Sequence, residues 1–122
     1  ISSMELMYHP ELKPAILNYR KHLNPHTGKL LVVVNNPYLI SQTYQISYQK
    51  RQAYEHVFKG IIAKNLKIHT PLSEFISEFL QAGFHLEQMK EIYCKGKDCA
   101  GFQGNAVVGL PDFLAFVFKL GE

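Results

Sequence analysis

The side chains best placed to bind a ligand are Asn35 and Asn36, which directly follow the apolar run Leu30–Val34. An unbroken, β-branched run of this kind is typical of a strand buried on both faces of a parallel sheet. Open α/β sheets bind ligands just beyond the carboxyl ends of such strands. The Asn-Asn-Pro sequence therefore predicts a ligand site here, with a plain turn as the alternative interpretation.

Four tyrosines follow this strand within one short segment: Tyr38, Tyr44, Tyr48 and Tyr54. A tyrosine joins a flat apolar ring to a polar hydroxyl, so this group can line a pocket for an organic substrate. The alternative is that half-exposed tyrosines pack a lid helix. Apolar and aromatic residues at helical spacing predict such a helix over Ser41–Phe58, with an irregular segment from Gly60.

Two cysteines, Cys94 and Cys99, lie in a glycine-rich loop. A closed zinc site needs four ligands, so two cysteines alone do not predict a metal site. Free thiols are the expectation, and a disulfide or half of a metal site are the alternatives.

Two amphipathic helices must position these residues. Leu12, Ile16, Tyr19 and Leu23 form one apolar stripe, which predicts a helix over Glu11–Leu23 that ends in the turn before Gly28. A second helix is predicted to begin with Thr70 as N-cap and Pro71 as its first residue. Gly83 is its expected end, and its stripe comprises Leu72, Phe75, Ile76, Phe79 and Leu80.

Further strands are predicted on either side of the glycine-rich loop. Phe84–Tyr93 begins with apolar and polar residues in alternation, as expected of a strand near a sheet edge. Phe113–Leu120 is continuously apolar and predicts a second strand buried on both faces. Ile1–Tyr8 fits either the end of a strand or a first helical turn.

The composition indicates one α/β domain over residues 1–122. The chain is 47% hydrophobic and its net charge is only +3, from basic residues that are scattered rather than clustered. No apolar run approaches the roughly 20 residues of a membrane span, and no signal peptide is recognisable. A cytoplasmic location is therefore expected. Because the sequence begins with Ile1 and not with an initiator methionine, we expect this chain to be a piece of a longer polypeptide.

Several stretches together resemble the carboxyl-terminal half of class I S-adenosylmethionine-dependent methyltransferases of the small-molecule type. Residues 17–30 (LNYRKHLNPHTGKL) are similar to the family's helix and R-x-L-x-P-G-G-x-L run before the fifth strand, with His-Thr-Gly in place of the Gly-Gly. Residues 69–75 (HTPLSEF) with 80–84 (LQAGF) resemble its H-x-P-L-S-x-Y and A-G-F block. Residues 111–116 (PDFLAF) resemble the closing strand, and 3–9 (SMELMYH) the loop after the fourth strand.

The resemblance implies a partial Rossmann-like, mixed sheet with flanking helices, in which the last strand runs antiparallel between the other two. It implies S-adenosylmethionine as cofactor of the intact protein and a small organic molecule as methyl acceptor. The family's glycine-rich strand-to-helix turn is absent from this sequence. We therefore expect the cofactor-binding half to lie outside the chain, and the isolated chain to be inactive.

The resemblance also assigns roles to individual residues. Met4 and Glu5, with the following Tyr8 and His9, would flank the cofactor and substrate after the fourth strand. The acceptor would be bound by Asn35, Asn36 and Tyr38, together with Tyr44 and Tyr48 of the variable segment. His69 or His9 would be the general base, although a histidine just before a helix is also a common structural hydrogen-bonding residue.

Two functions of other kinds remain open. The chain could be a non-catalytic α/β domain that binds a partner, since a sheet interrupted at its edge leaves unpaired hydrogen-bonding groups near Ile1–Leu6. For the same reason, we expect the isolated chain to self-associate. A weakly basic RNA-binding module is a further possibility, resting on the tyrosines and on Lys50, Arg51, Lys59, Lys64 and Lys67.

Overall fold

The computed structural model describes residues 2–3, 6–57, 64–93 and 110–121. The predicted site residues Met4 and Glu5 and the cysteines Cys94 and Cys99 lie outside these ranges. The elements in chain order are β1 (Ser2–Ser3), the short 3-10 helix η1 (Leu6–Tyr8), α1 (Leu12–Lys21), β2 (Lys29–Asn35), α2 (Pro37–Thr43), β3 (Gln52–Val57), β4 (Lys64–His69), α3 (Leu72–Gln81), β5 (His85–Ile92) and β6 (Phe113–Lys119).

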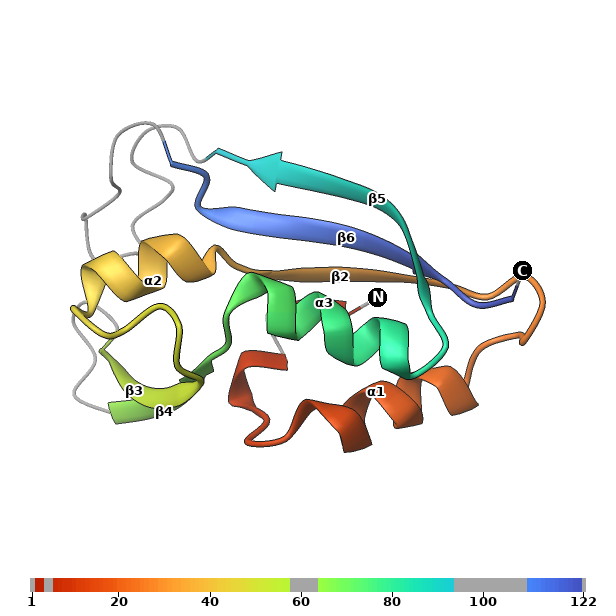
Figure 1. Ribbon diagram of the computed structural model, residues 1–122, viewed down its shortest axis with the longest axis horizontal. Coiled ribbons are helices and arrows are strands. Elements are labelled where there is room, and N and C mark those ends of the chain that lie inside the picture. Colours follow the sequence, from red (N-terminus) through yellow and green to blue (C-terminus); the bar gives the residue numbers. More distant parts are fainter. Residues whose placement is uncertain (1, 4–5, 58–63, 94–109, 122) are drawn as a thin grey trace.

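Four strands form the main sheet, in the order β1-β2-β6-β5. β1 is parallel to β2. β6 runs antiparallel to both of its neighbours, β2 and β5 (Figure 1). This arrangement confirms the predicted α/β class and the predicted mixed sheet. The last strand, β6, lies between β2 and β5, as the methyltransferase resemblance implied.

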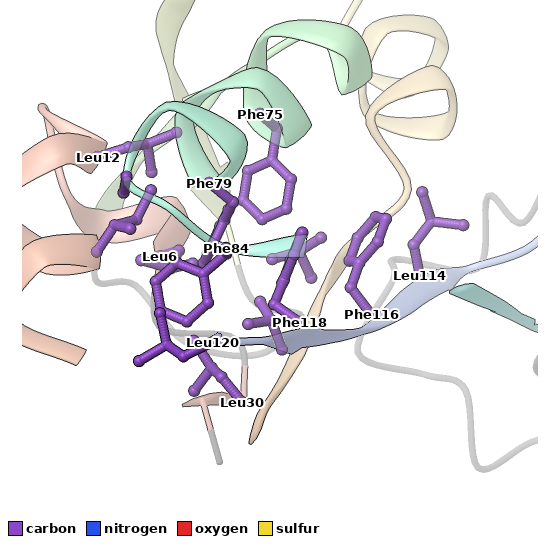
Figure 2. Close-up of a cluster of buried hydrophobic side chains, with 14 residues drawn as sticks. Leu6, Leu12, Leu30, Phe75, Phe79, Phe84, Leu114, Phe116, Phe118 and Leu120 are labelled. Atoms are coloured by element: carbon purple, nitrogen blue, oxygen red, sulfur yellow. The ribbon is translucent and has the colours of Figure 1, made fainter. Parts of the chain in front are cut away.

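The hydrophobic core lies on one face of this sheet, under α1 and α3 (Figure 1). Phe79 of α3 is fully buried and stacks on Phe118 of β6, with 4.1 Å between the ring centroids and 4° between the planes. Figure 2 shows further aromatic and aliphatic side chains around this pair. Aromatic burial of this extent is a dominant stabilising contribution in a small domain.

The two helices are joined at their carboxyl ends. The guanidinium of Arg20 in α1 donates a hydrogen bond of 2.9 Å to the carbonyl of Ala82, which caps α3. Gly83 follows with a φ of +94°, a conformation that glycine adopts without strain. The predicted glycine stop of this helix is thus confirmed.

The opposite face of the sheet is not covered by any described element (Figure 1). Along β2 and β6 the side chains alternate between buried and more exposed, and Leu31, opposite Val117 in the register, is 36% exposed. The prediction that both strands are buried on both faces is therefore wrong for this chain. Their continuous apolar sequence is present, but only one of the two faces has a helical layer.

The predicted helix over Ser41–Phe58 is also wrong. Helix α2 ends at Thr43, Gln45 has a φ of 53°, and Gln52–Val57 is the strand β3. β3 pairs antiparallel with β4, which occupies part of the segment predicted to be irregular. The physical reason is side-chain alternation: Tyr54 is buried between two exposed neighbours, Ala53 and Glu55, as on a strand with one packed face.

The start of α3 differs from the prediction by one residue. Pro71 is the N-cap and α3 begins at Leu72, because the hydroxyl of Thr70 instead accepts a hydrogen bond from Arg51. The hydroxyl of Tyr48 accepts the backbone N–H of Leu72 at 3.0 Å. Leu80, predicted to belong to the apolar stripe, is 50% exposed. No helix in the described part of the chain has the length and apolar character that a membrane crossing requires.

The stacked pair under α3 yields a first prediction. Phe79→Ala should lower the free energy of unfolding by about 3–5 kcal/mol, because it leaves a cavity beside Phe118. Urea denaturation followed by circular dichroism measures this loss. Leu80→Ala on the same helix is the control and should change stability by no more than about 0.5 kcal/mol. Equal losses from both variants would contradict the assigned core.

Candidate functional site

A small cavity lies where the carboxyl end of β2 meets η1, the β3–β4 hairpin and the start of α3. Its volume is about 40 Å³. Most of its lining is aliphatic, from residues such as Leu6, Val34 and Ile68, and the polar lining residues are Asn35, Tyr54, His69 and Thr70. Asn35, predicted to bind a ligand at the end of β2, and His69, predicted to lie just before α3, therefore line the same cavity.

Asn35 is 7% exposed, and its side chain contacts Met7 and Tyr54. Nδ2 lies 3.3 Å from the sulfur of Met7, and the same side chain forms a hydrogen bond with the hydroxyl of Tyr54. Its Oδ1 atom is buried and has no hydrogen-bond partner among the described residues. A buried acceptor without a donor is destabilising, so this atom is a candidate ligand contact.

His69 is 2% exposed and is fixed by the hairpin. Its Nε2 atom lies 2.9 Å from the backbone carbonyl of Tyr48. A carbonyl only accepts, so Nε2 carries the proton, and in the neutral ring Nδ1 is then an acceptor. Nδ1 is buried and has no partner in the described part of the chain. Two unpaired acceptors, on Asn35 and His69, therefore belong to side chains that line the same cavity.

The tyrosines connect α2 to the hairpin. Tyr38 and Tyr48 stack with ring centroids 4.3 Å apart, and Tyr44 contacts Tyr54 at 4.7 Å. The ring of Tyr48 also meets His69 edge-on at 5.6 Å. Only Tyr54 of these four lines the cavity. The interpretation of a lid helix is wrong because this segment contains a hairpin, and the cavity receives one tyrosine rather than four.

Burial changes the acidity of these hydroxyl groups. It raises the pKa of Tyr48 to about 12, with a further increase from the hydrogen bond to Tyr38 and a decrease from the N–H of Leu72. Burial also raises the pKa of Tyr54, and the hydrogen bond with Asn35 partly offsets this increase. Desolvation also raises the pKa of Tyr44. Tyr44, Tyr48 and Tyr54 are therefore protonated over the physiological pH range.

The other predicted site residues that the structure describes do not line the cavity. Asn36 is 2% exposed and is used structurally: its Oδ1 accepts the N–H of Tyr38, and its Nδ2 donates to the carbonyl of Pro111 at 2.8 Å. His9 is half-buried, and its carbonyl accepts a hydrogen bond from Arg51. Their predicted roles in binding or base catalysis stay predictions, as do those of Tyr38, Tyr44 and Tyr48.

Sequence reasoning named Tyr54 only as one of four tyrosines that could line a pocket, and it missed Lys67 as a member of this region. Tyr54 of β3 and Lys67 of β4 are cross-strand partners. Lys67 is two positions from His69 on β4 and therefore shares its strand face. Lys67 is 4% exposed, its ammonium lies 5.4 Å from the centre of the Tyr8 ring, and burial lowers its pKa. Recognition of the β3 alternation would have placed both side chains. The burial of Lys67 also removes one cation from the surface proposed for RNA.

The described residues contain no group of three or more histidines, cysteines or acidic residues arranged to hold a metal ion.

This architecture is similar to that of several solved structures. Over 99% of the chain, it superposes on a Listeria monocytogenes protein assigned to the S-adenosylmethionine-dependent methyltransferases, with a TM-score of 0.73 and 17% identity. The fold is that of class I S-adenosylmethionine-dependent methyltransferases. Over 97% of the chain it also matches such a methyltransferase from Mesorhizobium loti, with a TM-score of 0.61 and 14% identity. A third match is the glycopeptide N-methyltransferase MtfA complexed with S-adenosylmethionine, over 98% of the chain, with a TM-score of 0.57 and 11% identity.

This chain spans only part of each of these methyltransferases. It covers 60% of the Listeria protein, 59% of the Mesorhizobium enzyme and 52% of MtfA. No protein-family model and no curated protein sequence matches the chain. The structural likeness therefore establishes the fold, and the activity of the whole protein is a proposal.

The cavity at Asn35 and His69 does not by itself enclose S-adenosylmethionine. The cavity of about 40 Å³ has room for roughly one water molecule, far less than a nucleoside needs. Met4 and Glu5, which the resemblance assigned to the cofactor, lie outside the described residues. The cavity has room only for a few atoms of a ligand.

The tyrosine acidities predict a loss of stability at alkaline pH. Because the pKa of Tyr48 is about 12 in the folded protein and its ordinary value is 10.0, folding favours the neutral phenol. This contribution is fully present below pH 10 and should be lost as the pH rises through 12. Urea midpoints at successive pH values should therefore fall above pH 10.

Tyr48→Phe tests the assignment, because it removes the titrating hydroxyl. The decline above pH 10 should become shallower in this variant, and stability at neutral pH should fall by about 1 kcal/mol through loss of the bond to Leu72. Tyr93→Phe, at a residue 52% exposed, is the control and should leave the profile unchanged. An unaltered alkaline decline in Tyr48→Phe would refute the assignment.

Proposed function

We propose that this chain is the carboxyl-terminal, acceptor-side part of an S-adenosylmethionine-dependent methyltransferase. The observation that carries the proposal is the sheet order β1-β2-β6-β5 with antiparallel β6, on a fold shared with methyltransferases over nearly the whole chain. In this proposal, S-adenosylmethionine is bound mainly by residues outside the described ones, beyond the edge strand β1. The isolated chain is then inactive.

The uncovered sheet face supports the idea of a part rather than a complete enzyme. Leu31 and Val117 lie next to each other on this face, and no described element packs over them. β1, with two residues, is the outermost strand next to β2. The matched methyltransferases are longer than this chain. We assign the missing cover, and the next strand beyond β1, to the rest of the same polypeptide.

His69 is the general base of this proposal. Its Nε2 proton is committed to the carbonyl of Tyr48, so Nδ1 is the atom that can accept the proton an acceptor releases. Asn35 would orient the acceptor through Oδ1. The proposal also keeps a small organic acceptor, which fits the small cavity, and a cytoplasmic location.

A second candidate function, a non-catalytic domain that binds a partner, is favoured by the same apolar sheet face. A flat, apolar surface with an adjacent short edge strand is a common docking surface. Under both proposals the isolated chain has an exposed face that a second copy can cover, so we propose that it self-associates.

Self-association is tested by sedimentation velocity over a range of concentrations. The unmodified chain should form dimers or larger species as its concentration rises, and Leu31→Glu should shift it toward the monomer by placing a charge on the uncovered face. Leu80→Glu adds the same charge at an exposed helix position and should not. A monomer at all concentrations would contradict this part of the proposal.

The methyltransferase proposal is tested by calorimetry with S-adenosylhomocysteine. The polypeptide purified from its natural source should bind this product, whereas the 122-residue chain should not. His69→Gln in the native polypeptide should reduce methyl transfer by about 10²–10⁴-fold and leave product binding intact. A native polypeptide that fails to bind S-adenosylhomocysteine would overturn the proposal and leave the partner-binding domain.

A further inference from the structure

The hydrogen bond that orients the imidazole of His69 comes from a turn and not from a helix or strand. Its acceptor is the backbone carbonyl of Tyr48, 2.9 Å from Nε2, and Tyr48 lies in the connection between α2 and β3. A turn has no ladder of hydrogen bonds to fix its carbonyl groups. The proton of the imidazole therefore depends on the contacts that hold this turn in place.

One set of contacts comes from the hairpin. The side-chain nitrogen of Gln52 donates to the carbonyl groups of Ser47 and Lys50, at 2.9 and 3.1 Å. These two carbonyl groups lie on either side of Tyr48 in the sequence. Gln52 is also the cross-strand partner of His69, so one position of the hairpin holds both the turn and the imidazole.

The second set of contacts comes from the side chain of Tyr48 itself. Its hydroxyl accepts the N–H of Leu72, the first residue of α3, at 3.0 Å. Its ring stacks on Tyr38 with 4.3 Å between the centroids and 8° between the planes, and it meets His69 edge-on at 5.6 Å. Tyr38 is fixed in turn, because its N–H donates to the side chain of Asn36. The turn is thus joined to both α2 and α3.

We propose that Tyr48 is a positioning residue for His69. The contacts of its side chain with Leu72 and Tyr38 hold its carbonyl against Nε2, and this keeps the imidazole proton on Nε2. Nδ1 then stays unprotonated, which is the state that a general base requires. The catalytic consequence rests on the proposed function, whereas the tautomer of His69 does not.

A purely structural Tyr48 would behave differently. If its ring only filled space and Gln52 alone set the turn, removal of the ring would lower the free energy of unfolding but leave the tautomer of His69 unchanged. The position of the imidazole proton therefore separates the two roles, which a stability measurement cannot do.

The test is a long-range ¹H–¹⁵N correlation spectrum of the ¹⁵N-labelled 122-residue chain at pH 8. In the unmodified chain, His69 should carry its proton on Nε2, and Nδ1 should resonate as an unprotonated nitrogen. In Tyr48→Ala the ratio of the Nε2–H to the Nδ1–H tautomer should fall about fivefold, as expected when one ordinary hydrogen bond is lost. Tyr48→Phe keeps the stacked ring and should restore most of this ratio.

Tyr44→Ala is the matched control. It removes a ring of the same size from the same segment, but this ring contacts Tyr54 and not Tyr48. The ratio should stay as in the unmodified chain. A proton on Nδ1 in the unmodified chain, an unchanged ratio in Tyr48→Ala, or an equal change in Tyr44→Ala would each overturn the inference.

Tyr38→Leu keeps the inference testable if Tyr48→Ala does not fold. Tyr38 is 47% exposed, so its replacement removes the stacking contact without opening the core. The tautomer ratio should fall by about twofold, because the bond to Leu72 remains. An unchanged ratio in Tyr38→Leu would then count against the proposed role of Tyr48.

The tautomer measurement does not involve the cofactor. If the ratio changes as stated but the native polypeptide fails to bind S-adenosylhomocysteine, the positioning role stands and the proposed function fails. If the native polypeptide binds S-adenosylhomocysteine and the ratio does not respond to Tyr48→Ala, the proposed function stands and the positioning role fails.

Discussion

The structure depends on the packing of α3 against a single face of the sheet. Phe79 stacked on Phe118 fixes α3 over β6, and Arg20 then ties the end of α1 to the end of α3. The start of α3 is tied to the hairpin by the bond between Leu72 and Tyr48. Because one helix is anchored at both ends, the sheet, the first helix and the hairpin have fixed relative positions. The cavity at the end of β2 is a consequence of that arrangement.

The same arrangement explains how residues distant in the sequence come to share one site. β2 ends at Asn35, and the hairpin returns the chain so that His69 directly precedes the anchored helix. Hydrogen bonds to Met7 and to the carbonyl of Tyr48 then orient the two side chains. A site held by two independent elements in this way is preorganised, as the proposed positioning of a methyl acceptor requires.

Much of the fold could be predicted from the sequence, since helical stripes and apolar runs report directly on burial. The α1 and α3 helices and the strands β2, β5 and β6 follow from such patterns, and the strand order followed from a family resemblance. The β3–β4 hairpin could not be predicted, because Tyr44, Tyr48 and Phe58 also fit a helical period. Only the burial of Tyr54 between exposed neighbours distinguishes the strand β3 from a helix. The exposed Leu31 could not be read either, since an apolar residue has the same sequence signature whether or not a covering layer is present.

The site was predicted in part. Asn35 was placed by the rule that ligands bind beyond strand ends, and His69 by resemblance, and the structure puts both on one cavity. The neighbouring Asn36 has the same side chain, but its amide forms hydrogen bonds with the backbone of Tyr38 and Pro111. No local sequence pattern predicts these bonds. Lysine is usually a surface residue, and Lys67 is buried because its strand, β4, pairs with β3.

The central claim is that a further part of the same polypeptide covers the free sheet face and extends the sheet beyond β1. The most direct measurement is the intact mass of the protein from its natural source, with tandem mass-spectrometric sequencing through whatever adjoins the present chain. The account predicts additional strands and helices that include a glycine-rich strand-to-helix turn. A native polypeptide consisting of these 122 residues alone would contradict it.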